Sequence, residues 1–292
     1  MRRQIKRPPL EASCVLVTAC IEDQQLTKQR RQEGQALSAP IVQHSDLAGR
    51  GVLVTGGGSG IGAALTAGFA AQGAKVAFID IAEGPSHELV SELSARSMHP
   101  VTYVKADLRS VEQAQDAVRK AAAGLGSISV LVNNAGWDDR HDVDEVTEGY
   151  WDESQAVNLR QMFFVTQASL PYLRQARSAS IINFSSISYL LNMGDLPSYA
   201  AAKAGIIGLT KSLAGRLGPE GIRVNAILPG MIVTERQKRL WLTEESISST
   251  VARQCLKRPL TEADLVGPCL FLASSASAGM TAQTIIIDGG LL

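Results

Sequence analysis

The sequence predicts an α/β protein, a single doubly wound domain whose seven-stranded parallel sheet carries helices on both faces. From Leu47 onward, short apolar runs alternate with helix-like stretches, and a glycine-rich turn follows the first run. Such alternation is typical of a parallel sheet covered on both sides. The 292 residues, 45% of them hydrophobic, are enough for one large buried core.

Seven runs have the length and composition of buried strands. They are Gly51–Thr55, Lys75–Asp80, Val101–Ala106, Ile128–Asn133, Ser180–Ser185, Arg223–Leu228 and Thr284–Ile287. Helices are expected between them, including two long ones at Trp151–Gln175 and Ser198–Leu217. Ligands of such folds bind beyond the carboxyl ends of the strands, so the residues after each strand are the functional candidates.

Residues 1–45 have a different composition, with basic residues mixed with Gln and Pro and little hydrophobic periodicity. We expect a tail that is disordered or lies upstream of the true start, which leaves 46–292 as the folded domain. The apolar run Cys14–Ile21 is a poor match to a signal peptide, since it is short and lacks a clear cleavage site.

The composition argues against several classes of partner. Formal charge is zero and basic residues are not clustered in the core, so neither nucleic acid nor an anionic membrane is expected. No apolar run approaches the roughly 20 residues that span a bilayer, and we expect a soluble, cytoplasmic protein. The four cysteines lack metal-ligand spacing, so no metal is expected and reduced thiols are the default.

The stretch from Val52 to Gly62 predicts a strand, a tight turn and a helix. Glycine tolerates backbone angles that a Cβ forbids, and free N–H groups at a helix N-terminus bind phosphate. A nucleotide pyrophosphate is therefore expected on this turn. The predicted contacts are Gly56, Ser59, Gly60, Ile61 and Gly62.

The end of the second strand predicts the choice of cofactor. Asp80 lies about twenty residues beyond the turn, where a carboxylate can accept hydrogen bonds from both ribose hydroxyls and repel a 2′-phosphate. No cation stands at Ser59 or Ile81 to bind such a phosphate, and NAD is favoured. An Asp that merely caps the next helix is the alternative. Further predicted cofactor contacts follow the third and fourth strands: Asp107, Leu108, Asn134, Ala135 and Gly136.

A catalytic group is predicted on the helix Ser198–Leu217, where Tyr199 and Lys203 share a face. Positive charge near a phenol favours the phenolate, so Lys203 and a cationic nicotinamide ring together are expected to lower the pKa of Tyr199 and allow it to act as a base. Ser186 would donate a hydrogen bond to the substrate, and Asn158 would hold a water linking Lys203 to solvent. The four histidines have no metal or triad spacing and are interpreted as solvated or capping residues.

These motifs together resemble the classical short-chain dehydrogenase/reductase family, whose members have a Rossmann fold, and the resemblance covers residues 47–292. T-G-G-G-S-G-I-G at 55–62, N-N-A-G at 133–136, Y-A-A-A-K at 199–203 and I-D-G-G at 287–290 occur in family order. The resemblance implies hydride transfer, with Tyr199 as base and Lys203 holding the ribose. It also implies cofactor contacts from the P-G-M-I-V-T segment: Pro229, Gly230, Ile232 and Thr234.

Within that family, several stretches resemble bacterial NAD-dependent aldose 1-dehydrogenases such as D-xylose 1-dehydrogenase, among them D-D-R-H at 138–141 and W-L-T-E-E at 241–245. Such enzymes oxidise the anomeric hydroxyl of a sugar to a lactone. A sugar needs many polar partners, and a face of the sugar ring can stack on a tryptophan. The candidates are Asp138, Asp139, Arg140, Ser186, Ser188, Asn192 and Trp241. A solvated charged loop is the alternative for 138–141.

The resemblance also implies a mobile lid at about residues 235–257 and a homotetramer built from long helices. Two other functions stay open at this point. One is a dehydrogenase or reductase of another carbonyl class, such as a 3-oxoacyl thioester, a cyclic diol or a steroid. The other is a catalytically silent nucleotide-binding protein.

Overall fold

The computed structural model describes residues 42–292, and Gln43–Leu292 form one compact unit. Most of the predicted tail, residues 1–41, lies outside the described residues. Within the part described, no helix is both long and apolar enough to cross a membrane.

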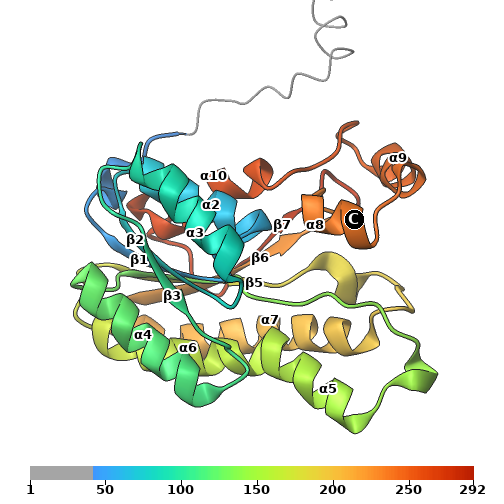
Figure 1. Cartoon of the computed structure of the whole chain (residues 1–292), viewed down its shortest axis with the longest axis horizontal. Coiled ribbons are helices and arrows are strands. Elements are labelled where there is room, and N and C mark those ends of the chain that lie inside the picture. Colours follow the sequence, from blue (N-terminus) through green and yellow to red (C-terminus); the bar gives the residue numbers. More distant parts are fainter. Residues whose placement is uncertain (1–41) are drawn as a thin grey trace, which may run out of the picture. The chain divides into compact units, whose positions relative to one another are not determined.

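A parallel seven-stranded sheet runs through the centre of the unit, in the order β3-β2-β1-β4-β5-β6-β7 (Figure 1). The order reverses between β1 and β4, which is the doubly wound topology, so the predicted fold class is confirmed. Each predicted strand is present to within two residues at either end. The strands are β1 Gly51–Thr55, β2 Lys75–Asp80, β3 Thr102–Lys105, β4 Val130–Asn133, β5 Ala179–Phe184, β6 Ile222–Pro229 and β7 Thr284–Ile287.

Helices cover both faces of the sheet, as Figure 1 shows. One face carries α2 Gly60–Ala71, α3 Glu83–Ser94 and α10 Ala263–Ala273, and the other carries α4 Val111–Leu125, α6 Gln161–Leu173 and α7 Pro197–Leu217. Two short helices, α8 Glu235–Leu240 and α9 Glu244–Arg253, follow β6, and α5 Glu148–Gln155 precedes α6.

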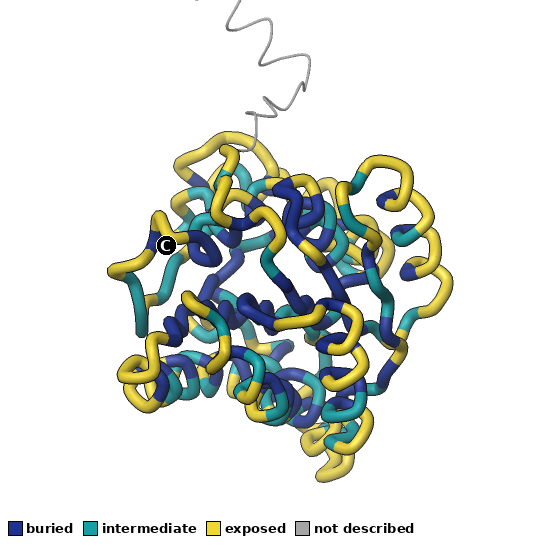
Figure 2. Tube along the Cα trace, turned by 90° about the vertical axis from the view of Figure 1, so that its left-hand side faces the viewer, coloured by how far each residue is buried: buried dark blue, intermediate teal, exposed yellow. Residues whose placement is uncertain are grey.

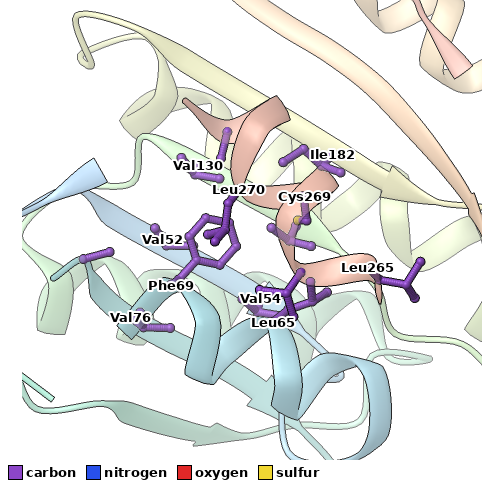
Figure 3. Close-up of a cluster of buried hydrophobic side chains, with 14 of the residues drawn as sticks. Val52, Val54, Leu65, Phe69, Val76, Val130, Ile182, Leu265, Cys269 and Leu270 are labelled. Carbon is purple, nitrogen blue, oxygen red and sulfur yellow. The ribbon is translucent and has the colours of Figure 1, made fainter. Parts of the chain in front are cut away.

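The core consists of two main apolar clusters, one on each side of the sheet. In the first, Phe69 of α2 and Leu270 of α10 pack on Val52 of β1 and Val130 of β4 (Figure 3). Strands β1, β4, β5 and β6 are buried at every position, and the tube in Figure 2 is dark along them. Since both faces of the sheet are buried, its carboxyl edge is the place left for polar groups.

One predicted helix is wrong in detail. The stretch expected as a single helix, Trp151–Gln175, is divided into α5, a π-helical turn at Ala156–Arg160, and α6. A π turn inserts an extra residue into the helix and redirects the side chains on it. Here it places Asn158, which is fully buried, against the loop that follows β4.

Candidate active site

The glycine turn is tied to the end of β4 by side chains. Thr55 Oγ1 accepts hydrogen bonds from the backbone N–H groups of Asn134 and Ala135, at 3.0 and 3.1 Å. In return, Asn134 Nδ2 donates to the carbonyls of Thr55 and Gly56, at 3.1 and 3.0 Å. The two chain segments at the reversal point of the sheet are therefore held as one rigid unit.

Close backbone contact explains two of the glycines. A Cβ on Gly62 would lie 1.7 Å from the Gly56 carbonyl oxygen, and one on Gly56 would lie 2.8 Å from Ala135 Cα. Gly60 differs, because its φ of +51° is the left-handed region and a Cβ there would meet only Thr234, at 3.9 Å. Space beside Gly60 at the start of α2 is thus open, which suits a pyrophosphate on the helix N-terminus.

Asp80 lies at the carboxyl end of β2 and is fixed by two backbone groups. Its Oδ2 accepts from Gly58 N and its Oδ1 from Ala82 N, both at 2.9 Å. The second bond is a local one, although α3 has Ala82 as its N-cap residue and no side-chain cap, and the first links the carboxylate to the glycine turn. Each carboxylate oxygen can accept more than one hydrogen bond, so a ribose can still be bound.

A single cavity of about 1960 Å³ connects these features with the catalytic candidates. It exceeds the ~300–1,000 Å³ typical of pockets for drug-sized ligands, and so has room for a dinucleotide and a substrate together. Every predicted cofactor residue lines it, as do six of the seven predicted substrate residues. Two candidates do not: the catalytic candidate Asn158 and the substrate candidate Asp139.

Ser186, Tyr199 and Lys203 come together at one wall of this cavity. Ser186, just after β5, accepts a hydrogen bond from Ser188 N at 3.1 Å, so its own O–H is free to donate and is directed to Tyr199. Lys203 Nζ lies 5.3 Å from the centre of the Tyr199 ring and donates to the Phe184 carbonyl at 3.0 Å. Lys203 is only 3% exposed, and two of its three donors have no hydrogen-bond partner within residues 42–292.

The pKa values at this site are set mainly by burial. Burial raises the pKa of Tyr199 well above its ordinary value, and the negative charge of Asp138 raises it further, while the Ser186 hydrogen bond and Arg236 lower it. Burial also lowers the pKa of Lys203 to about 8. In the protein alone, desolvation therefore dominates the pKa of Tyr199. The expected lowering by Lys203 together with a cationic nicotinamide ring concerns the complex and stays a prediction.

Asn158 joins the π-helical turn to the loop that follows β4. Its Oδ1 accepts from Trp137 N at 2.8 Å and its Nδ2 donates to Trp137 O at 2.9 Å. Each end of the amide keeps a second hydrogen-bonding position, so the water expected here stays a prediction. The two bonds fix the start of the Trp137–His141 loop.

Asp138 joins this loop to helix α8. Its carboxylate accepts a hydrogen bond from Gln237 Nε2 and lies 3.6 Å from Arg236 Nη1. Asp138 is therefore tied to α8 within the fold, with its side chain 23% exposed.

The other loop candidates have separate partners. Arg140 forms an ion pair with Asp195, and its guanidinium lies 5.6 Å from the centre of the Trp241 ring. Asp139 lies outside the cavity lining because its carboxylate faces the Tyr150 hydroxyl, at 3.5 Å.

Two polar atoms among the substrate candidates are buried without a partner. Ser188 Oγ and Trp241 Nε1 have no hydrogen-bond partner anywhere in the described residues. Both residues line the cavity, but these two atoms are themselves buried within the protein, and an unpaired buried polar atom costs free energy. Asn192 also lines the cavity and is exposed.

The two ends of the segment predicted as a lid, residues 235–257, are joined to each other. Ile232 and Leu260 form a parallel bridge, and Val233 N donates to Leu260 O at 2.8 Å. Between them, α8 and α9 contribute Trp241 and several other residues to the cavity. Its far end pairs with the C-terminal segment, through Leu256 N and Gly289 O at 2.9 Å.

Three side chains at the site had no sequence motif to reveal them. Gln237 binds Asp138, and Gln155 and His141 both bind Ser198. For His141, the sequence indicated only a solvated or capping histidine. Among residues 42–292 there is no cluster of His, Cys, Asp and Glu that would hold a metal ion.

The doubly wound sheet, the glycine turn and the serine, tyrosine and lysine beside one cavity define a nucleotide-dependent oxidoreductase. A family model described as enoyl-(acyl carrier protein) reductase matches residues 56–292. The chain belongs to the short-chain dehydrogenase/reductase family, as predicted, and the fold of this family binds a nicotinamide cofactor.

Named relatives include sugar dehydrogenases. The chain is 61% identical over 255 residues to a protein named probable galactose dehydrogenase from Rhizobium meliloti, covering 87% of this chain and all of the relative. It is 46% identical to the D-xylose 1-dehydrogenase of Caulobacter vibrioides, over 85% of this chain and 97% of the relative. A crystal structure of a dehydrogenase/reductase from Sinorhizobium meliloti 1021 matches with a TM-score of 0.79 and 30% identity, over 85% and 98% of the two chains.

Proposed function

We propose that the protein is an NAD-dependent aldose 1-dehydrogenase that oxidises the anomeric hydroxyl of a pentose or hexose to the lactone. The observation that carries this proposal is the set of polar side chains that line one cavity with Tyr199: Asp138, Arg140, Ser186, Ser188 and Asn192. A polyhydroxylated substrate would offer hydrogen-bond partners to several of them. The relatives named for galactose and D-xylose support the same substrate class.

The residues around the cavity fit a dinucleotide. The open space at Gly60 would take the pyrophosphate, Asp80 the adenosine ribose, and Lys203 the nicotinamide ribose with its two unpaired donors. The predicted contacts from Pro229, Gly230, Ile232 and Thr234 line the same cavity. When bound, the oxidised nicotinamide ring supplies a hydride acceptor and a positive charge.

Residues of the chain would remove the proton from the anomeric hydroxyl. Tyr199, as phenolate, would accept the proton of the anomeric hydroxyl, while Ser186, whose O–H is directed to Tyr199 in the protein alone, would donate to that oxygen and orient it. Burial holds the pKa of Tyr199 high in the protein alone, so we infer that nearby positive charge in the complex is needed to bring the phenolate within reach. Lys203, charged below its pKa of about 8, contributes to that field.

The surroundings of Asp80 favour NAD over NADP. Its carboxylate would repel a 2′-phosphate. Lys105, which faces Asp80 across β2 and β3, is paired with Glu83, and Arg109, which lines the cavity, is paired with Asp107 and Glu153. Among the described residues near Asp80, no unpaired guanidinium is therefore placed to bind the 2′-phosphate of NADP.

We also propose that residues 235–257 act as a lid and that the protein is a homotetramer. The lid segment is anchored at the Ile232–Leu260 bridge, which would allow the part between to move as a flap. Phe163 and Trp151 are 42% and 41% exposed on α6 and α5, as expected of helices that meet a second copy. Sedimentation equilibrium of the purified protein would give the number of subunits.

Initial-rate formation of NADH tests the proposed activity. The purified protein would be assayed with NAD or NADP against D-xylose, L-arabinose, D-galactose, D-glucose and L-fucose. We expect turnover with NAD and one or two of these sugars, with a lactone as product. Binding of NADH without turnover on any sugar would contradict the aldose assignment and direct the search to other carbonyl substrates.

A further inference from the structure

The helix that carries Tyr199 and Lys203 begins without a cap of its own. The residue before α7 is Leu196, whose side chain cannot accept a hydrogen bond, and the first helical residue, Pro197, has no N–H. The first N–H groups of a helix have no partner inside it, so they need one elsewhere. Ser198 N–H is the first donor of α7 without a partner inside the helix. Tyr199 is the next residue.

Ser198 is held instead by side chains from two other elements. His141 Nε2, from the loop after β4, accepts the hydrogen bond of Ser198 N at 3.3 Å. Gln155 Nε2, at the end of α5, donates to Ser198 O at 2.9 Å and to Ser198 Oγ at 3.2 Å. Ser198 is fully buried, so these bonds are shielded from water. We call the His141, Gln155 and Ser198 group the α7 clamp.

The bonds of His141 fix the state of its ring. An Nε2 that accepts from a backbone N–H carries no proton, so in the neutral ring the proton lies on Nδ1. That nitrogen lies 3.1 Å from the Asp139 carbonyl and 2.8 Å from the Tyr150 hydroxyl, and the hydroxyl in turn lies 3.5 Å from the Asp139 carboxylate. The ring is thus oriented at both ends, and Asp139 and Tyr150 act through it.

We propose that His141 is a positioning residue for the catalytic tyrosine: by capping the first turn of α7, it fixes where the Tyr199 hydroxyl lies relative to Ser186. A misplacement of about 1 Å at a reacting group can cost 100-fold in rate. Without the cap, the first turn of α7 frays and Tyr199 spends less time in its productive position. Cofactor and substrate are held by other residues, so the loss falls on kcat.

The test compares His141→Leu with His141→Gln, because glutamine keeps an acceptor at the place of Nε2 and leucine does not. For His141→Leu we expect kcat to fall about 10-fold to 100-fold, with KM for the sugar and Kd for NADH changed less than about 3-fold. His141→Gln should keep kcat within about 3-fold of the wild type. A kcat for His141→Leu within twofold of the wild type, an equal loss in both variants, or a rise in KM alone would overturn the proposal.

A second measurement does not depend on the substrate, which matters because the kinetic test rests on the proposed function. Amide hydrogen exchange of the peptide covering residues 198–203, followed by mass spectrometry, should be faster in His141→Leu and unchanged in His141→Gln. The peptide covering the glycine turn serves as the internal reference. If wild-type protein turns over no sugar, the proposed function fails, while exchange alone decides whether His141 caps α7; unchanged exchange in His141→Leu would overturn the inference.

Discussion

Lys203 is a buried cation with no carboxylate bound to it in the described chain, and this has a cost in stability. Its pKa is about 8 in the folded protein, below the ordinary value of 10.5 for a lysine side chain. Below pH 8 the amine is charged in both states and the cost is fully present; between pH 8 and 10.5 it declines, because the folded state loses its proton first.

Lys203→Met should therefore stabilise the protein without its cofactor. A pKa difference of this size corresponds to about 3 kcal/mol at most, and we expect a gain of ~1–3 kcal/mol at pH 7. The gain should shrink at pH 9.5. Urea unfolding at both pH values measures it, and a variant less stable than wild type at pH 7 would contradict the argument.

Tyr199 is the only group of the site placed to remove a proton from the substrate in this proposal. Tyr199→Phe removes the hydroxyl but keeps the ring, so we expect turnover to fall at least ~10³-fold while NADH still binds. Initial rates and NADH fluorescence titration measure the two effects. Tyr172→Phe, in α6, is the matched control and should be fully active. Activity of Tyr199→Phe near that of the control would show that another group is the base.

Asp80 determines the cofactor preference if its carboxylate repels a 2′-phosphate. Asp80→Ser combined with Ile81→Arg removes the repulsion and adds a guanidinium, and kcat/KM for NADP relative to NAD should rise at least ~100-fold. Asp116→Ser, on the outer surface of α4, makes the same change of charge and should not alter the ratio. An unchanged ratio in the double variant would mean that Asp80 serves only to hold Gly58 and Ala82.

At the scale of elements, the contact between the Trp137–His141 loop and α8 sets how firmly the lid segment rests on the cavity. Gln237→Leu removes the hydrogen bond to Asp138, and a bond of this kind is worth about 0.5–1.5 kcal/mol. We therefore expect KM for the sugar to rise roughly 2-fold to 10-fold with little change in kcat.

Lys238→Leu is the control for this change. It lies on the same short helix and pairs only with Glu235, on the outside. Initial rates across a sugar titration measure both variants. Equal KM values for Gln237→Leu and Lys238→Leu would show that the loop does not hold the lid segment.

Local pattern predicted some elements well and failed for others. The strands and the glycine turn were predictable because β-branched runs and glycines determine the backbone conformation of their own segment. The π turn at Ala156–Arg160 was not, because it depends on Asn158 reaching Trp137, a contact across 21 residues. Likewise, Tyr199 and Lys203 were predictable from their spacing, whereas Gln237 and His141 serve the site only through tertiary contacts.

At the scale of the whole molecule, the doubly wound order followed from the alternation of strands and helices. What the sequence could not predict is the balance of charge and burial inside the assembled cavity. In the protein alone, desolvation dominates the pKa of Tyr199, since the packing of β5, α7 and the segment after β6 removes water from the site. Burial is a property of the complete fold and no single motif encodes it.

The joining of the Trp137–His141 loop to α8 has a consequence for the timing of events. The bonds from Asp138 to Gln237 and Arg236 lie within the chain, so they form without any ligand. If residues 235–257 act as the proposed lid, a sugar that enters beneath α8 would wait for these bonds to break. At high sugar concentration the observed rate of association should therefore reach a plateau, set by how often the flap swings open and no longer by diffusion.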